Sequence, residues 1–181
     1  MKRHLAPVVV LGAVAAAFAA VPRVSRAALH AMETSFDRRM ATLSSDIPFE
    51  ILGYTRGVYL EGFGAVFTAE VNLSQSIDIT PFQSTIPKEY ILKLHQRKTE
   101  RVPVLKRSME DAMLDMAASL DAVPSGEQIV LGVTLFYRKW EDTSGLPSQI
   151  VMQAERQKLL DVKLGHAGRS SLDSVIRVAE L

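Results

Sequence analysis

The fold is organised by the stretch Pro87–Ala122, which reads PKEYILKLHQRKTERVPVLKRSMEDAMLDMAASLDA. Its apolar residues recur at steps of three, four or their sums, which places them in one stripe along one face of an α-helix. Charged and amide side chains occupy most of the other face. The stripe consists of Ile91, Leu94, Val102, Leu105, Met109, Met113, Met116 and Leu120. The stretch therefore predicts one long amphipathic helix.

This helix has recognisable ends and one irregularity. Ser84 or Thr85 can cap its first turn, where Pro87 costs little because the first turn leaves N–H groups unpaired in any case. Residues 124–126 (Pro-Ser-Gly) end it. Pro103 removes one backbone hydrogen bond inside the pattern and clashes with the preceding turn, so we expect a kink or a restart there.

Strand-like segments precede the helix. Gly57–Leu60 and Ala65–Leu73 flank a turn that contains Gly62 and Gly64. The second segment alternates apolar and polar residues, as does a strand with one buried face and one wet face. The turn lacks the following helix and the Lys-Ser/Thr pair of a phosphate-binding loop, so a turn between strands explains both glycines.

Strand-like segments also follow the helix. Gln128–Tyr137 is apolar almost throughout, which indicates a central strand, and Ser148–Ala154 alternates again. Arg156–Leu164 predicts a short helix, and the β-branched residues of Ser174–Leu181 favour a last strand over a helical turn. The order β-β-α-β-β-α-β predicts an α+β fold, with an antiparallel sheet of about four to five strands packed against one long and one short helix. An open sheet edge at the last segment makes a homodimer plausible.

The amino terminus has the pattern of an export signal. Met1–His4 is basic, Leu5–Val21 has no charged residue, and Ala17–Ala19 fits the small-residue pattern that precedes a cleavage site. These features favour a signal peptide over residues 1–21. The alternative is an uncleaved anchor, although the apolar run is slightly shorter than the ~20 residues that span a bilayer comfortably. We expect a periplasmic or secreted protein, or else a domain anchored outside the cytoplasmic membrane.

The chain after this segment divides into a leader and one domain. Residues 22–46 carry apolar side chains at helical spacing, which predicts an amphipathic helix that either leads out of the membrane or packs on the domain. We expect this leader to be loosely attached, as termini often are. Residues 47–181 then form a single α+β domain of ordinary size. The helical positions of the leader are Leu29, Met32, Phe36, Met40 and Leu43.

Composition excludes several classes of function. The chain has no cysteine, so it has no disulfide, thiol nucleophile, zinc–thiolate site or iron–sulfur cluster. The formal net charge is +1, and loss of Lys2 and Arg3 with the signal leaves the chain near neutral, which does not indicate nucleic-acid binding. The basic first half of the long helix is interpreted as a solvated face.

No catalytic or metal-binding motif is present. The four histidines are widely spaced, none in H-x-x-x-H or H-E-x-x-H, and no serine-nucleophile motif occurs. We therefore predict no catalytic residue, metal ligand or cofactor. The histidines are His4, His30, His95 and His166, and an enzyme that uses His95 with the carboxylates Glu61, Glu70, Glu141 and Asp142 is the alternative.

Aromatic residues supply the candidate binding site. Trp140 is the only tryptophan and stands among charged residues near a loop, as binding anchors often do. The predicted binding residues are Trp140, Tyr137, Arg138, Tyr59 and Phe63. We predict a non-enzymatic exported domain that binds an unknown protein or small-molecule ligand and no nucleic acid. It contacts a membrane only if the N-terminal segment is retained, which is the hypothesis of a tethered accessory protein.

Overall fold

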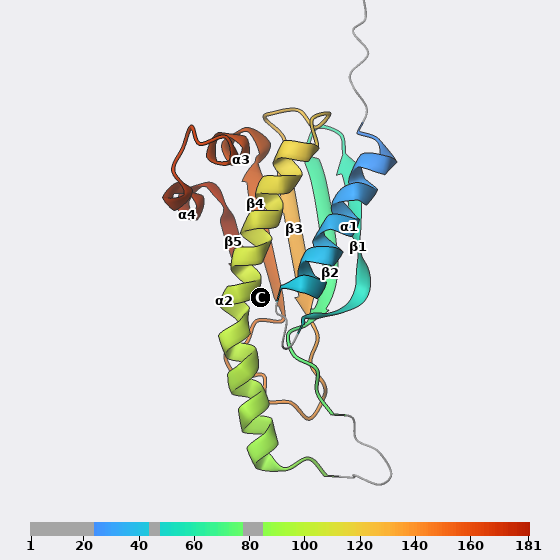
Figure 1. Cartoon of the computed structure of the whole chain (residues 1–181), viewed down its shortest axis with the longest axis vertical. Coiled ribbons are helices and arrows are strands. Elements are labelled where there is room, and N and C mark those ends of the chain that lie inside the picture. The colour runs from blue at the N-terminus through green and yellow to red at the C-terminus, as the bar shows by residue number, and fades with distance from the viewer. Residues whose placement is uncertain (1–23, 44–47, 78–84) are drawn as a thin grey trace, which may run out of the picture.

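The computed structural model describes residues 24–43, 48–77 and 85–181, and both Ser84 and the predicted signal peptide of residues 1–21 lie outside these ranges. Within them the chain forms one five-stranded sheet with its helices against one face (Figure 1). The elements are α1 (Arg26–Thr42), β1 (Glu50–Leu60), β2 (Gly64–Asn72), α2 (Lys88–Ser119), β3 (Gln128–Leu135), β4 (Gln149–Glu155), α3 (Arg156–Lys163), the 3₁₀-helix η1 (Arg169–Ser171), α4 (Leu172–Val175) and β5 (Arg177–Glu180). The α+β fold, the long helix and the final strand are confirmed.

The five strands lie in the sheet in chain order, from β1 to β5. All neighbouring pairs are antiparallel except β2 and β3, which are parallel. The sheet is therefore mixed, and the expectation of a purely antiparallel sheet is wrong. The reason is α2, which carries the chain back along the sheet so that β3 starts at the same end as β2.

The long helix α2 is continuous over 32 residues and does not restart at Pro103. Pro103 and Thr99, whose carbonyl loses its usual partner, both lie on the exposed side, where water can satisfy that carbonyl. A helix of this length spans about 48 Å, whereas the eight residues of β3 span about 27 Å. One half of α2 therefore extends past the end of the sheet (Figure 1).

The core lies between the helices and the inner face of the sheet. Alternate residues of β2, β3 and β4 point into it, and the C-terminal half of α2 packs on them. The helix predicted in the leader is α1, which buries Phe36 and Met40 in this core. The expectation of a loosely attached leader is therefore wrong, because α1 covers the part of the sheet that α2 leaves open.

Side chains of α1 also occupy the outer edge of β1. Glu33 Oε1 accepts a hydrogen bond from Gly57 N at 2.7 Å, and Asp37 Oδ1 accepts one from Thr55 N at 3.1 Å. Arg26 donates to Gly57 O at 3.0 Å. These contacts use backbone groups to which another strand would otherwise pair. Two register shifts in β1 further discourage pairing, so this edge of the sheet is closed.

The turn between β1 and β2 requires its glycines, as predicted. Gly62 and Gly64 have positive φ angles of 78° and 136°. A Cβ on Gly64 would lie 1.9 Å from the backbone oxygen of Gln128, at the start of β3. Only a glycine lets β2 and β3 approach each other here.

Candidate binding site

The half of α2 that extends past the sheet packs against two loops (Figure 1). This unit, named the lower lobe, consists of residues 73–77, 88–103 and 136–148 and contains no strand. Three of the five predicted binding residues, Tyr137, Arg138 and Trp140, lie in it. The segment 136–148 follows β3 directly, so these residues leave the sheet at the end where the helix continues.

A buried ion pair lies at the centre of the lower lobe. Lys98 Nζ is 2.5 Å from Glu141 Oε2, and the two side chains are only 1 % and 2 % exposed. Lys98 Nζ also donates to Phe136 O at 3.3 Å and lies 4.9 Å from the centre of the Tyr137 ring. Burial lowers the pKa of Lys98, an effect that the Glu141 carboxylate partly offsets. The pair therefore pays a desolvation penalty to hold segment 136–148 against α2.

Sequence reasoning missed this pair, although it left a signal. Lys98 lies four residues after Leu94 and four before Val102, so it occupies a position within the apolar stripe. The lysine is buried because segment 136–148 folds over the stripe in the lower lobe, where no sheet covers it. A lysine at a stripe position predicts a buried acidic partner.

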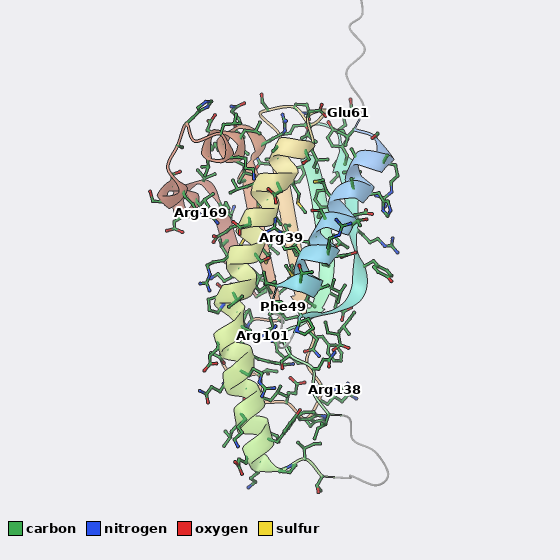
Figure 2. All side chains as sticks on the ribbon, viewed as in Figure 1. Arg39, Phe49, Glu61, Arg101, Arg138 and Arg169 are labelled. Carbon is green, nitrogen blue, oxygen red and sulfur yellow. The ribbon has the colours of Figure 1, made fainter. Side chains whose placement is uncertain are left out.

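Glu141 also connects the ion pair to the other loop. Its Oε1 accepts a hydrogen bond from Ser76 Oγ at 3.1 Å, and Ser76 Oγ in turn accepts one from Arg138 Nε at 3.1 Å. Lys98, Glu141, Ser76 and Arg138 thus link all three segments of the lower lobe. Figure 2 shows Arg138 at this end of the molecule.

Trp140 packs on α2 through an aromatic neighbour. The ring centres of Tyr90 and Trp140 are 6.1 Å apart, with the planes inclined at 47°. Tyr90 is itself fixed, because its hydroxyl accepts a hydrogen bond from Ile77 N at 3.2 Å. Trp140 is partly exposed, and its indole N–H has no hydrogen-bond partner among the described residues. It presents an apolar ring and an unpaired donor at the surface.

The titratable groups beside Trp140 hold the loop in place. The Tyr137 hydroxyl donates to Pro147 O at 2.8 Å, and burial, with a contribution from Glu141, raises the pKa of Tyr137 to about 12. His95 Nδ1 lies 3.0 Å from the carbonyl oxygen of Asp142, which identifies Nδ1–H as the donor. The first contact closes segment 136–148 on itself, and the second holds the segment against α2.

The other two predicted binding residues lie at the opposite end of the sheet. Tyr59 donates through its hydroxyl to Glu127 Oε1 at 3.3 Å, and Phe63 is partly exposed in the β1–β2 turn. Figure 2 places Glu61, from the same turn, at the end away from Arg138. The five residues therefore form two separate groups. The carboxylates Glu61 and Glu70 are likewise outside the lower lobe, on the turn and on β2.

A cluster of ion pairs connects α1, α2 and the C-terminal helices. Asp115 pairs with Arg39 and with Lys163, whose Nζ lies 2.7 Å from Oδ1, and Asp111 pairs with Arg39 and Arg169. These side chains surround a hollow of about 410 Å³. The two acids are shared among three bases from different helices, so we interpret the cluster as a set of ion pairs that holds these helices together.

The described ranges contain no group of three or more His, Asp or Glu side chains that could hold a metal ion. No helix within them is long and apolar enough to cross a membrane. No family model matches the chain, and no curated protein or solved structure matches it.

Proposed function

We propose that the protein is a non-enzymatic binding or accessory domain that acts outside the cytoplasm and binds its partner through the lower lobe. The observation that carries this proposal is the buried Lys98–Glu141 pair. It fixes one conformation of a loop that adds little to the core between sheet and helices.

A buried ion pair is a poor source of stability, since well-packed apolar side chains of similar size are often as stabilising. Its effect here is positional: it sets the loop that carries Trp140. Rigid elements that present one aromatic side chain among charged groups are typical of binding surfaces. Elsewhere on its surface the lower lobe exposes the side chain of Leu92 and the bases Lys88, Arg97 and Lys139.

The hydrogen bonds of His95, Tyr137 and Glu141 support binding over catalysis. Each of these groups contacts the backbone or another side chain of the lower lobe. A general base needs a lone pair beside the group whose proton it takes. The lone pair on His95 Nε2 has no hydrogen-bond partner among the described residues, so no nucleophile is held beside it. The basic and apolar pattern of residues 1–21 supports export to the periplasm or the medium, and an anchored form would keep the same domain outside the membrane.

Replacing Trp140 by alanine tests this proposal. We expect immobilised full-length protein to retain a partner from an extracytoplasmic extract, and we expect Trp140→Ala to reduce that retention about tenfold or more. The unfolding free energy should change little, because Trp140 lies outside the main core. Phe63→Ala is the matched control, since it removes an exposed aromatic ring at the opposite end. Equal retention by all three proteins, or loss only with Phe63→Ala, would contradict a site in the lower lobe.

A further inference from the structure

The sheet face opposite the helices is uncovered by any described element of the chain, and is named the open face (Figure 1). Its side chains alternate with those of the core along each strand. Apolar residues gather on it across four strands, and two of them, Val58 and Leu60, are about half exposed. The apolar group consists of Val58, Leu60, Val66, Val130 and Val151.

We infer that the open face is the interface of a symmetric dimer, in which the open face of a second copy of the chain covers it. This goes beyond the proposed function, which concerns the lower lobe of one copy. The inference rests on a glycine in the central strand, on the size of the face and on the arrangement of its charges.

Gly132 lies in the middle of β3, the central strand, where it pairs with Thr68 on one side and Val151 on the other. Glycine inside a strand costs about 0.5–1 kcal/mol relative to alanine. Nothing within one copy requires it, because a Cβ at this position would meet no atom closer than 3.9 Å and its φ is not positive. The register is unbroken on both sides of Gly132, and a strand glycine outside a bulge often marks a place where a ligand or another backbone approaches closely.

The shape of the open face around Gly132 is compatible with packing against the same face of a second copy. Val130 and Val151 lie beside the gap left by Gly132, on the same strand and on the next one, and Val151 is partly exposed whereas Val130 is buried. A two-fold axis at Gly132 would place the two glycines opposite each other, so the central strands of the two copies could approach closely with Val130 and Val151 packed around them.

The size of the face is also sufficient. Five strands at about 4.8 Å spacing, with about eight residues at ~3.3 Å each, make a face of about 24 by 26 Å, or about 600 Å². Stable interfaces bury about 600–1,000 Å² on each partner. Two sheets packed face to face at ~10 Å would reach that range without help from other elements.

The two charges nearest the centre are opposite in sign. Arg56 and Glu70 are both exposed and have no ion-pair partner among the described residues. From the strand register, Arg56 lies about 10 Å from Gly132 and Glu70 about 8 Å from it. These distances are nearly equal. A two-fold axis that passes Gly132 and lies in the plane of the interface, midway between the directions of Arg56 and Glu70, can therefore bring Arg56 of each copy over Glu70 of the other. A hollow of about 360 Å³ between the two residues leaves room for that contact.

The two edges of the sheet are less suitable as dimer interfaces than the open face. The β1 edge is closed by Glu33 and Asp37 of α1. The β5 edge has four residues, and Glu180 on it is paired with Lys106 of α2 at 2.6 Å. A short edge strand whose charged side chain is already paired is a poor template for the addition of another strand. A homodimer therefore forms through the face.

Gly132→Val tests the inference by sedimentation velocity of the full chain as it is isolated from cells. The wild type should be a dimer at about 10 μM, and Gly132→Val should raise the dimer dissociation constant about tenfold or more. Measured on the monomer, its unfolding free energy should change little, because a Cβ at this position makes only ordinary contacts at 3.9 Å and valine favours strands. Gly126→Val is the matched control, since a Cβ there meets nothing within 4 Å and the residue lies in the turn before β3, outside the sheet.

A second variant keeps the inference testable if Gly132→Val does not fold. Val58→Lys places a charge on a half-exposed position of the open face, where a monomer tolerates it and the dimer does not. It should sediment as a monomer. Three results would each overturn the inference: a monomeric wild type, a wild type found only as a complex with a different protein, or dimers that survive in both open-face variants.

Discussion

Replacing Glu141 by glutamine is expected to lower the free energy of unfolding by about 3–5 kcal/mol, because it leaves the buried Lys98 charge without a counter-charge. Lys98 and Glu141 are almost completely buried, so water cannot take the place of the lost partner. The variant should also release segment 136–148 from α2. Urea unfolding measures the stability change, and the emission of Trp140, the only tryptophan, reports the release as a shift to longer wavelength.

Two controls separate the ion pair from the substitution itself. Lys98→Met combined with Glu141→Gln removes both charges, and it should be less destabilising than the sum of the two single changes. Glu89→Gln makes the same chemical change at an exposed pair, in which Lys93 and Glu89 are 70 % and 78 % exposed, and should cost less than ~0.5 kcal/mol. A cost below ~1 kcal/mol for Glu141→Gln would show that the pair does not organise the lower lobe.

Acid is expected to destabilise the protein partly through Glu33, which joins α1 to β1. Burial of this carboxylate acts to raise its pKa, but hydrogen bonds from Arg26, His30 and Gly57 N outweigh burial and hold the pKa at about 2. An unfolded glutamate titrates near 4.5. Between these two values the folded state binds fewer protons than the unfolded state, so stability rises with pH.

The contribution of Glu33 is therefore complete above about pH 4.5 and disappears as the pH falls to about 2. We expect it to be on the order of 2 kcal/mol, since solvent around Arg26, whose side chain is 59 % exposed, weakens that partner. Urea unfolding of the wild type and Glu33→Gln at several pH values measures it. The difference between the two proteins should be largest at neutral pH and shrink below pH 4.5. A difference that stays constant with pH would contradict this role.

The sequence predicts which helices and strands form better than it predicts which of them pack against each other. The apolar stripe of residues 91–120 gives α2, and alternation gives the strands, because periodicity reports which side of an element is buried. It does not report what covers that side. The parallel pairing of β2 with β3 depends on the direction in which α2 returns the chain. The burial of Lys98 depends on a loop more than forty residues away in sequence.

The candidate site was predictable in part for the same reason. Tyr137, Arg138 and Trp140 are neighbours in sequence, so they stay together in the lower lobe. Tyr59 and Phe63 lie at the opposite end, because β3 runs away from the β1–β2 turn before it reaches Tyr137. The sequence does not predict that Phe36 lies in the core. The pattern near the terminus shows an amphipathic helix, but it does not show which surface that helix packs on.

The most direct test of the central claim, that the lower lobe binds a partner outside the cytoplasm, is photo-crosslinking in intact cells. A photoreactive aromatic amino acid, which keeps a ring at the position, replaces Trp140 in one full-length variant and Phe63 in another, and fractionation followed by mass spectrometry identifies each adduct. We predict an adduct of one defined mass at position 140 and none at position 63, in the extracytoplasmic or membrane fraction. No adduct at position 140, or an adduct confined to the cytoplasmic fraction, would contradict the claim.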